Sequence, residues 1–243
     1  MMEYGHGGDT YRNRNVELDF SVNVNPLGMP NFVWEAAQRS IAFCTGYPDS
    51  SCENLRGRLS EITGVPEDQM IFGNGAAELI FRLVQEVRPK KAVIPAPSFA
   101  EYETALRSCG TEIAFFYLKE AESFFLNISE FLDFLRAEQP EIIFLCTPAN
   151  PTGAMIRQAD LSKILDYCRK HGILLVLDEC FVEFLDEERS CGCICEFLDW
   201  ETERPEHGGS LFLLRAFTKT YAMAGVRLGG CIATIIGLFE PIE

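Results

Sequence analysis

The feature that most constrains the fold is a regular alternation of short apolar runs with amphipathic ones. Helical spacing of apolar residues marks Ala76–Val87, Ile128–Ala137 and Leu161–Arg169. Strands that are apolar throughout are covered on both faces, so the pattern predicts an α/β fold with a seven-stranded, mostly parallel sheet between helices. The predicted strands are Met70–Phe72, Ala92–Pro95, Glu112–Leu118, Ile142–Cys146, Ile173–Leu177, Leu211–Leu214 and Gly229–Thr234.

Length and charge narrow the class of protein. The 243 residues, 47% of them apolar, suit one large α/β domain with a substantial core. A net charge of -15 argues against nucleic-acid and anionic-membrane partners. No apolar run approaches the ~20 residues of a membrane helix, and the first residues lack an apolar signal core. With most cysteines placed in apolar runs as small hydrophobes, we expect a cytoplasmic protein.

One cluster of thiols stands apart, at Cys191, Cys193 and Cys195. Its alternating spacing could offer thiolates to a soft metal. However, the next histidine is His207, and no second cysteine pair completes a set of four ligands. We therefore expect free thiols on a loop or short helix and no metal site.

A glycine-rich turn follows the first predicted strand and opens a helix. The sequence Gly-Asn-Gly-Ala-Ala-Glu ends at Glu78, and such a turn points free backbone amides at an anion, with Ala76 and Ala77 leaving room for a phosphate. It also imitates a dinucleotide fingerprint, but Glu78 replaces the third glycine and the next strand ends in Pro-Ala-Pro. A phosphate site is favoured over a nicotinamide site, and an ordinary strand–helix turn is the alternative.

Three further side chains follow strands, where parallel sheets bind ligands. Phe99 could stack on a flat heteroaromatic ring, or be one core residue among 19 phenylalanines. Asp178 ends a very apolar strand, where a carboxylate is costly without a partner such as a protonated pyridine nitrogen. A helix cap or a backbone amide is the alternative partner. Asn150, in Asn-Pro-Thr-Gly, could donate to a phenolic oxygen or simply form a turn.

Lys219 follows the sixth predicted strand, directly after Thr218, with Arg227 further along. Together with the three preceding motifs, in this order, the segment resembles the pyridoxal-phosphate enzymes of the aspartate aminotransferase fold. The resemblance implies that Lys219 bonds the cofactor, pyridoxal 5'-phosphate, and moves the proton at the substrate Cα. It implies that Asp178 pairs with the ring nitrogen and Asn150 with the ring oxygen. The implied cofactor-binding set is Ala76, Ala77, Phe99, Asn150, Asp178, Thr218, Lys219 and Arg227.

The resemblance extends to the branch that contains histidinol-phosphate aminotransferase and threonine-phosphate decarboxylase. The Tyr-Pro-Asp segment at Tyr47 matches this branch, where the tyrosine reaches the cofactor phosphate of the partner subunit of a homodimer. The opening His-Gly-Gly-Asp and the segment Leu18–Gly28 resemble the decarboxylase. They imply that His6, Gly7 and Asn25 contact a small phosphorylated substrate. The residue type at Phe181 also resembles that of the decarboxylase, because the aminotransferase usually carries a tyrosine at this position.

The implied activity is a lyase that decarboxylates L-threonine O-3-phosphate to (R)-1-aminopropan-2-ol O-phosphate in cobalamin biosynthesis. An aminotransferase of the histidinol-phosphate type and a non-catalytic fragment are the alternatives. The two reactions differ in which Cα bond lies perpendicular to the cofactor ring, and the groups that grip the substrate carboxylate decide between them.

The resemblance covers about residues 4–234, whereas family members continue into a small C-terminal domain that binds the substrate carboxylate. We therefore expect a truncated chain that binds the cofactor and turns over poorly. Its predicted parts are an N-terminal arm and helix (1–45, with the helix at about Asn31–Phe43), a pyridoxal-phosphate-binding large domain (46–236) and a tail unlike the family (237–243).

Overall fold

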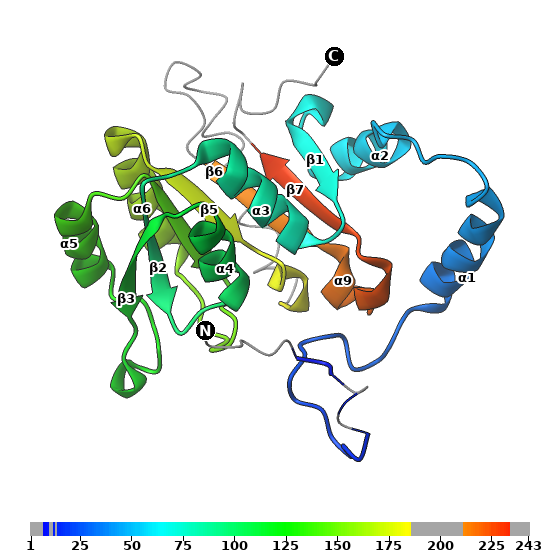
Figure 1. The fold of residues 1–243 in the computed structure, drawn as a ribbon, viewed down its shortest axis with the longest axis horizontal. Coiled ribbons are helices and arrows are strands. Elements are labelled where there is room, and N and C mark those ends of the chain that lie inside the picture. The colour runs from blue at the N-terminus through cyan, green and yellow to red at the C-terminus, as the bar shows by residue number, and fades with distance from the viewer. Residues whose placement is uncertain (1–6, 10–11, 13, 186–210, 234–243) are drawn as a thin grey trace.

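A computed structural model of the chain describes residues 7–9, 12, 14–185 and 211–233 (Figure 1). Its centre is one seven-stranded sheet in the order β1-β7-β6-β5-β4-β2-β3. The predicted α/β architecture and the number of strands are confirmed. The strands are β1 (Met70–Gly73), β2 (Lys91–Ala96), β3 (Glu112–Tyr117), β4 (Ile142–Cys146), β5 (Leu174–Asp178), β6 (Leu211–Ala216) and β7 (Gly229–Ala233).

Only one strand of this sheet runs against the others. Strand β7 pairs antiparallel with both β1 and β6, and the remaining pairs are parallel. Because β1 is separated from β6 by this single reversed strand, β1 points the same way as β6. The carboxyl ends of β1, β2, β4, β5 and β6 therefore lie along one edge of the sheet, which is the edge where ligands of such sheets bind.

Several strand boundaries differ from the predicted ones by one or two residues, and hydrogen bonding explains two of these differences. Strand β6 continues to Ala216 because Arg215 and Ala216 pair with two glycines of β7. Strand β5 begins at Leu174 because the amide of Ile173 donates to the carbonyl oxygen of Cys168 at 2.8 Å, at the end of the preceding helix. The sequence pattern shows which residues are apolar. It does not show with which segment each backbone N–H or C=O group forms its hydrogen bond.

Helices cover both faces of the sheet, as the apolar strands predict (Figure 1). On one face, α3 (Ala76–Val87) and α4 (Ala100–Ser108) pack on side chains that include Phe144, Val176 and Leu214. The other face carries α5 (Ile128–Glu138) and α6 (Gln158–His171), which pack on alternate residues of the same strands. Each strand of the centre thus contributes to two apolar clusters, which explains why it has no polar face.

The helix ends follow local signals. The side chain of Asn127 accepts a hydrogen bond from the amide of Glu130 at 3.3 Å and so caps α5. Gly172 ends α6 in the left-handed conformation, with φ at 65°. Helix α4 and helix α2 (Glu53–Thr63) are additions to the predicted set.

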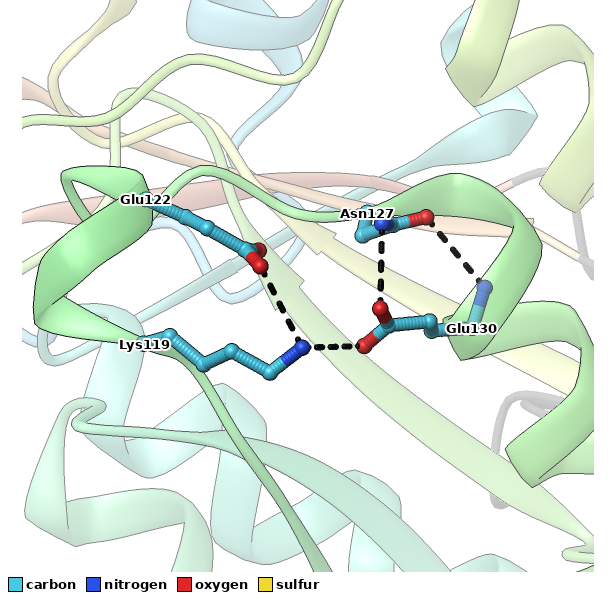
Figure 2. A network of polar contacts seen from close by, with 4 residues as sticks. All are labelled: Lys119, Glu122, Asn127 and Glu130. Carbon is cyan, nitrogen blue, oxygen red and sulfur yellow. Dashed lines mark hydrogen bonds and ion pairs between the residues drawn. The ribbon is translucent and has the colours of Figure 1, made fainter.

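A surface network closes the connection from β3 to α5, around the 3₁₀ turn η3 (Glu120–Glu122) (Figure 2). Lys119 Nζ lies 2.7 Å from a carboxylate oxygen of Glu130 and 3.2 Å from one of Glu122. The pKa of Lys119 is raised, chiefly by the hydrogen bond to Glu130 and then by the one to Glu122. Because these groups are exposed, the network holds the shape of the loop and adds little to overall stability.

The N-terminal part of the chain packs differently from the rest. The helix predicted at about Asn31–Phe43 is α1 (Asn31–Ser40) followed by the 3₁₀ turn η1 (Ile41–Phe43). Helix α1 has no buried residue and lies well away from the sheet (Figure 1). Several of the large apolar side chains in this region are exposed: Leu18, Phe20, Leu27, Phe32, Trp34, Ile41, Phe43 and Tyr47.

Six cysteines are free thiols in the structure: Cys44, Cys52, Cys109, Cys146, Cys168 and Cys180. Cys168 and Cys180 are buried as small apolar residues. Cys191, Cys193 and Cys195 lie outside the described residues, and so does His207. Within residues 7–185 and 211–233, so far as they are described, no group of three metal-binding side chains occurs. No helix in the described part of the chain is long and apolar enough to cross a bilayer.

Candidate active site

The sequence motifs meet at the carboxyl edge of the sheet. The turn after β1 opens α3, Phe99 follows β2 and precedes α4, and Asn150 follows β4. Asp178 is the last residue of β5. Lys219 lies on α9 (Phe217–Thr220), which directly follows β6. Five strand ends thus each contribute a candidate side chain, because parallel strands bring their following turns together.

The start of α3 meets the guanidinium of Arg227. Gly75 precedes the helix with φ at 87°, and no side chain caps the amides of the first turn, which contains Ala76 and Ala77. A Cβ placed on Gly75 would lie 2.8 Å from Arg227 Nη2. A positive side chain thus lies against the positive end of a helix dipole, an arrangement that attracts an anion such as a phosphate. Thr218, on α9, is buried.

Asp178 is a buried carboxylate, only 4% exposed. Its Oδ2 accepts a hydrogen bond from the hydroxyl of Tyr102 at 2.5 Å, and its Oδ1 accepts one from the amide of Cys180 at 2.9 Å. Within the described residues, no cationic side chain forms a salt bridge with it. A buried carboxylate with neutral donors alone favours a cationic ligand, although the backbone-amide partner considered from the sequence is also present.

Tyr102 is a site residue that sequence reasoning missed. Its side chain is fully buried on α4. Burial, and secondly the charge of Asp178, raise the pKa of its phenol well above the ordinary value. The signal that could have found it is its position three residues after Phe99 on a helix that faces the sheet, because a buried tyrosine needs a hydrogen-bond partner.

Lys219 lies beside an aromatic ring. Lys219 Nζ is 6.0 Å from the ring centroid of Phe181, which follows β5. A cation over an aromatic face at this distance is weakly attracted to it. Phe99 is partly buried and packs on the apolar cluster beneath α3 and α4.

The N-terminal arm crosses this edge of the sheet and contacts two motifs. The side-chain nitrogen of Asn23 donates to Asn150 Oδ1 at 3.3 Å. The backbone amide of Asn25 donates to the carbonyl oxygen of Lys219 at 3.0 Å, and its side chain donates to that of Thr220 at 2.9 Å. The predicted substrate contact Asn25 therefore binds the lysine-bearing turn, and Asn23 is an arm contact that sequence reasoning did not single out.

Three other residues are predicted for the site: His6, Gly7 and Tyr47. A Cβ on Gly7 would lie 1.8 Å from the carbonyl oxygen of Ser21, so the arm folds on itself at a position that only glycine can fill. His6 lies outside the described residues. Tyr47 is fully exposed, and the structure does not bring it to the other site residues of the same chain.

A cavity of about 390 Å³ lies between the arm, the Asn150 turn and the segment after β5. It is lined by Asn23, Val24, Pro148, Ala149, Pro151, Gly153, Phe181, Phe184 and Leu185. Because Phe181 also lies beside the Lys219 amine, the cavity adjoins the candidate active site. Its volume suits a small molecule.

Comparison with known proteins settles the family. The sequence profile of aminotransferase class I and II matches residues 15–235. The chain belongs to this family. The predicted resemblance to the aminotransferase fold is thereby confirmed.

Among aminotransferase class I and II relatives, threonine-phosphate decarboxylase of Salmonella typhimurium is 37% identical over 214 residues, which are 87% of this chain and 55% of that protein. A putative threonine-phosphate decarboxylase of Caldanaerobacter subterraneus is 34% identical over 229 residues, 94% and 59% of the two chains. Histidinol-phosphate aminotransferase of Methanosarcina barkeri is 31% identical over 211 residues, which are 85% of this chain and 52% of that protein. The chain thus spans little more than half the length of these relatives.

Solved structures share the fold. Histidinol-phosphate aminotransferase of Clostridium acetobutylicum superposes with a TM-score of 0.72 and 27% identity, covering 88% of this chain and 59% of that one. L-threonine-O-3-phosphate decarboxylase of Porphyromonas gingivalis gives a TM-score of 0.70 at 22% identity, covering 88% and 59%. Both the decarboxylase and the aminotransferase branches of the family therefore have this architecture, and the roles of individual site residues stay predictions.

Proposed function

We propose that this chain carries the pyridoxal 5'-phosphate site of a threonine-phosphate decarboxylase. The observation that carries the proposal is the position of Arg227 against the open start of α3, at the same sheet edge as Asp178 and Lys219. An anion site, a buried carboxylate and an amine on neighbouring turns fit the phosphate, the ring nitrogen and the aldehyde of this cofactor. The matching family supports the proposal.

Each residue has a role in holding the cofactor. The amides of Ala76 and Ala77, the hydroxyl of Thr218 and the guanidinium of Arg227 bind its phosphate. The remaining contacts are proposed for Phe99 against the ring face, Asn150 at the ring oxygen, Asp178 at the ring nitrogen and Lys219 at the aldehyde carbon. With Asn150 Oδ1 engaged by Asn23, the side-chain nitrogen of Asn150 is the group that donates to the ring oxygen.

The bound cofactor supplies an electron sink for the bonding electrons of the substrate Cα. The chain's own residues control the protons and the access of water. Asp178 keeps the ring nitrogen protonated, because a cation beside a buried carboxylate is favoured. Lys219 holds the proton that is delivered to Cα after the carboxylate has left as carbon dioxide. The arm closes the site and excludes water.

The proposed substrate is L-threonine O-3-phosphate, and the proposed product is (R)-1-aminopropan-2-ol O-phosphate, in cobalamin biosynthesis. The two decarboxylase relatives, at 37% and 34% identity, support this assignment. His6, Gly7 and Asn25 of the arm are the proposed substrate contacts, and Phe181 fits the decarboxylase pattern. The test uses threonine phosphate carrying a carboxyl-carbon label. Labelled carbon dioxide is the expected product, and label retained in an oxo acid would contradict the proposal.

An aminotransferase of the histidinol-phosphate type is the second candidate. The Methanosarcina barkeri relative, at 31% identity, and the Clostridium acetobutylicum structure favour it. Histidinol phosphate with 2-oxoglutarate as acceptor would then give glutamate, whereas the proposed decarboxylase would give none. If neither substrate reacts although the cofactor binds, the expectation that this chain turns over poorly is supported.

We also propose a homodimer, in which residues 46–236 form the cofactor-binding domain, 1–45 form the N-terminal arm and helix, and 237–243 form a tail outside both. The exposed side chains of Phe32, Trp34 and Phe43 support this, because an apolar surface of this kind is covered in a stable protein. Tyr47, exposed in one chain, would reach the cofactor phosphate of the partner subunit. Sedimentation analysis tests the proposal: a dimer is expected, and a monomer that binds the cofactor would contradict it.

A reducing compartment such as the cytoplasm is the proposed location. Six of the cysteines, from Cys44 to Cys180, are free thiols, which is usual where thiols are kept reduced. Thiol titration of freshly isolated, denatured protein should count all 10 cysteines of the chain. A lower count before any exposure to oxidant would contradict the proposal.

A further inference from the structure

The side chain of Tyr102 reaches from α4 to the end of β5. Its hydroxyl lies 2.5 Å from Asp178 Oδ2, and the two residues are 76 positions apart in the sequence. Tyr102 is fully buried, so no bulk water competes for this contact. A distance this short is typical of a hydroxyl that donates to an ionised carboxylate.

The tyrosine ring is held on two sides. It stacks on Phe144 of β4, with ring centroids 4.9 Å apart and an angle of 24° between the planes. Phe99 meets it edge to face, at 5.5 Å and 84°. Because the ring cannot rotate away without losing both contacts, the hydroxyl points in one direction only. Phe99 and Asp178, the residues proposed for the face and the nitrogen of the cofactor ring, are thus joined through one side chain.

The direction of the hydrogen bond depends on the chemistry of the two groups. Burial and the neighbouring negative charge raise the pKa of the phenol, so Tyr102 keeps its proton at neutral pH. The phenol donates and the carboxylate accepts. The amide of Cys180 donates to the other carboxylate oxygen at 2.9 Å, so both oxygens accept a hydrogen bond from the protein. The plane of the carboxylate is therefore set from two sides.

We propose that Tyr102 is a positioning residue that fixes the Asp178 carboxylate for a protonated ring nitrogen and aligns Phe99 with the same ring. The inference rests on the proposed function and adds a residue that binds no cofactor atom itself. The competing interpretation is that Tyr102 only fills the apolar core beneath α4. The two interpretations differ in whether the hydroxyl acts through Asp178.

The test compares four forms of the full chain: wild type, Tyr102→Phe, Asp178→Ala and the double variant. Tyr102→Phe keeps the ring and removes the hydroxyl alone. Tyr117→Phe serves as the matched control, because Tyr117 is largely exposed on β3. Two quantities are measured: the dissociation constant for pyridoxal phosphate, and the pH dependence of the visible absorption of the bound cofactor.

We expect Tyr102→Phe to weaken cofactor binding about tenfold, the effect of losing a hydrogen bond to a charged group, and to shift the pH midpoint of the absorption change. When Asp178 is already replaced by alanine, Tyr102→Phe should change the cofactor affinity less than about twofold, because the effects of substituting two coupled residues do not add. Tyr117→Phe should match wild type. An equal loss in both backgrounds, or unchanged affinity and spectrum in Tyr102→Phe, overturns the inference while leaving the proposed function in place.

Two further outcomes are decisive. If wild type itself does not bind pyridoxal phosphate, the proposed function fails and the role of Tyr102 fails with it. If circular dichroism shows that Tyr102→Phe does not fold, 3-fluorotyrosine is placed at position 102 instead, which keeps the hydroxyl and makes it more acidic. That substitution should shift the pH midpoint of the bound cofactor, and the same substitution at position 117 should not; equal behaviour at the two positions overturns the inference.

Discussion

Glu179 and Arg215 form an ion pair in which Oε2 lies 2.7 Å from Nη2, and the side chain of Glu179 is fully buried. The pair connects the end of β5, where Asp178 lies, with strand β6, which leads to Lys219. The amide of Glu179 also donates to the carbonyl oxygen of Leu214 at 2.9 Å. Asp178 and Lys219 therefore lie at or just after the ends of two strands that are held together by an ion pair and by backbone hydrogen bonds.

Removing one member of this pair should be costly. Arg215→Met leaves a carboxylate in the core without its cation, and we expect the free energy of unfolding to fall by about 3–5 kcal/mol. Chemical denaturation measures the change. The control is Arg58→Met, which breaks an exposed pair with Glu61 and should cost less than about 1 kcal/mol. Equal effects of the two substitutions would show that the buried pair has no special role.

A second prediction follows from the backbone conformation of Gly75. An alanine there would meet Arg227 Nη2 and would adopt φ near 87°, a region that costs a non-glycine residue about 1–3 kcal/mol. Gly75→Ala should therefore displace the guanidinium and weaken binding of pyridoxal phosphate. Gly172→Ala is the matched control, since Gly172 also has positive φ but no heavy atom, apart from its own and those of its two chain neighbours, lies within 4 Å of where its Cβ would be. It should lower stability and leave cofactor affinity unchanged; a similar affinity loss in both would contradict the prediction.

The attachment of the N-terminal arm to the turn that carries Lys219 should depend on Asn25. Asn25→Ala removes the side-chain hydrogen bond to the carbonyl of Thr220 and the one that Asn25 Oδ1 accepts from the amide of Leu27 at 3.0 Å. We expect trypsin to cleave after Arg14 several times faster, because local opening controls such cleavage. Asn31→Ala, at an exposed position of α1, is the control. Unchanged cleavage in Asn25→Ala would mean that the arm is held by other contacts.

Stability should fall at high pH. Burial raises the pKa of Cys168 from 9.0 to about 12. A raised folded-state pKa means that the unfolded thiol ionises first, so the contribution is complete below pH 9 and is lost as pH rises toward 12, by about 1.4 kcal/mol per pH unit. The pKa values of Tyr102, Cys146 and Cys180 are raised in the same direction. Cys168→Ala should make the fall of the unfolding free energy with pH less steep, by the amount that one titrating group contributes. An unchanged slope would contradict this.

Much of the fold could be predicted from the sequence because the responsible signals are local. The apolar runs mark all seven strands, and Gly172 marks the end of α6. Residues of the turns after strands meet because parallel strands share a carboxyl edge, which the pattern alone implies. This rule explains why the predicted residues Ala76, Phe99, Asn150, Asp178 and Lys219 lie at the carboxyl ends of five strands along one edge of the sheet.

Other parts depend on contacts between distant segments, which no local pattern contains. The bond from Tyr102 to Asp178 joins residues 76 positions apart, and that from Asn23 to Asn150 joins residues 127 apart. Asn25 fell within a recognised motif, but its use by the Lys219 turn depends on where the arm crosses the sheet edge. Helix α4 has a short and mixed apolar pattern, so its buried face becomes clear only when it packs beside α3.

The most direct test of the central claim is an absorption spectrum of the purified chain with added pyridoxal phosphate, beside Lys219→Ala and Lys119→Ala. Lys119 is a surface lysine and serves as the control. We predict that wild type and Lys119→Ala develop a visible band, that borohydride fixes the cofactor on a peptide containing Lys219, and that Lys219→Ala does neither. The same spectrum in wild type and Lys219→Ala, or cofactor fixed on other lysines, would contradict the account.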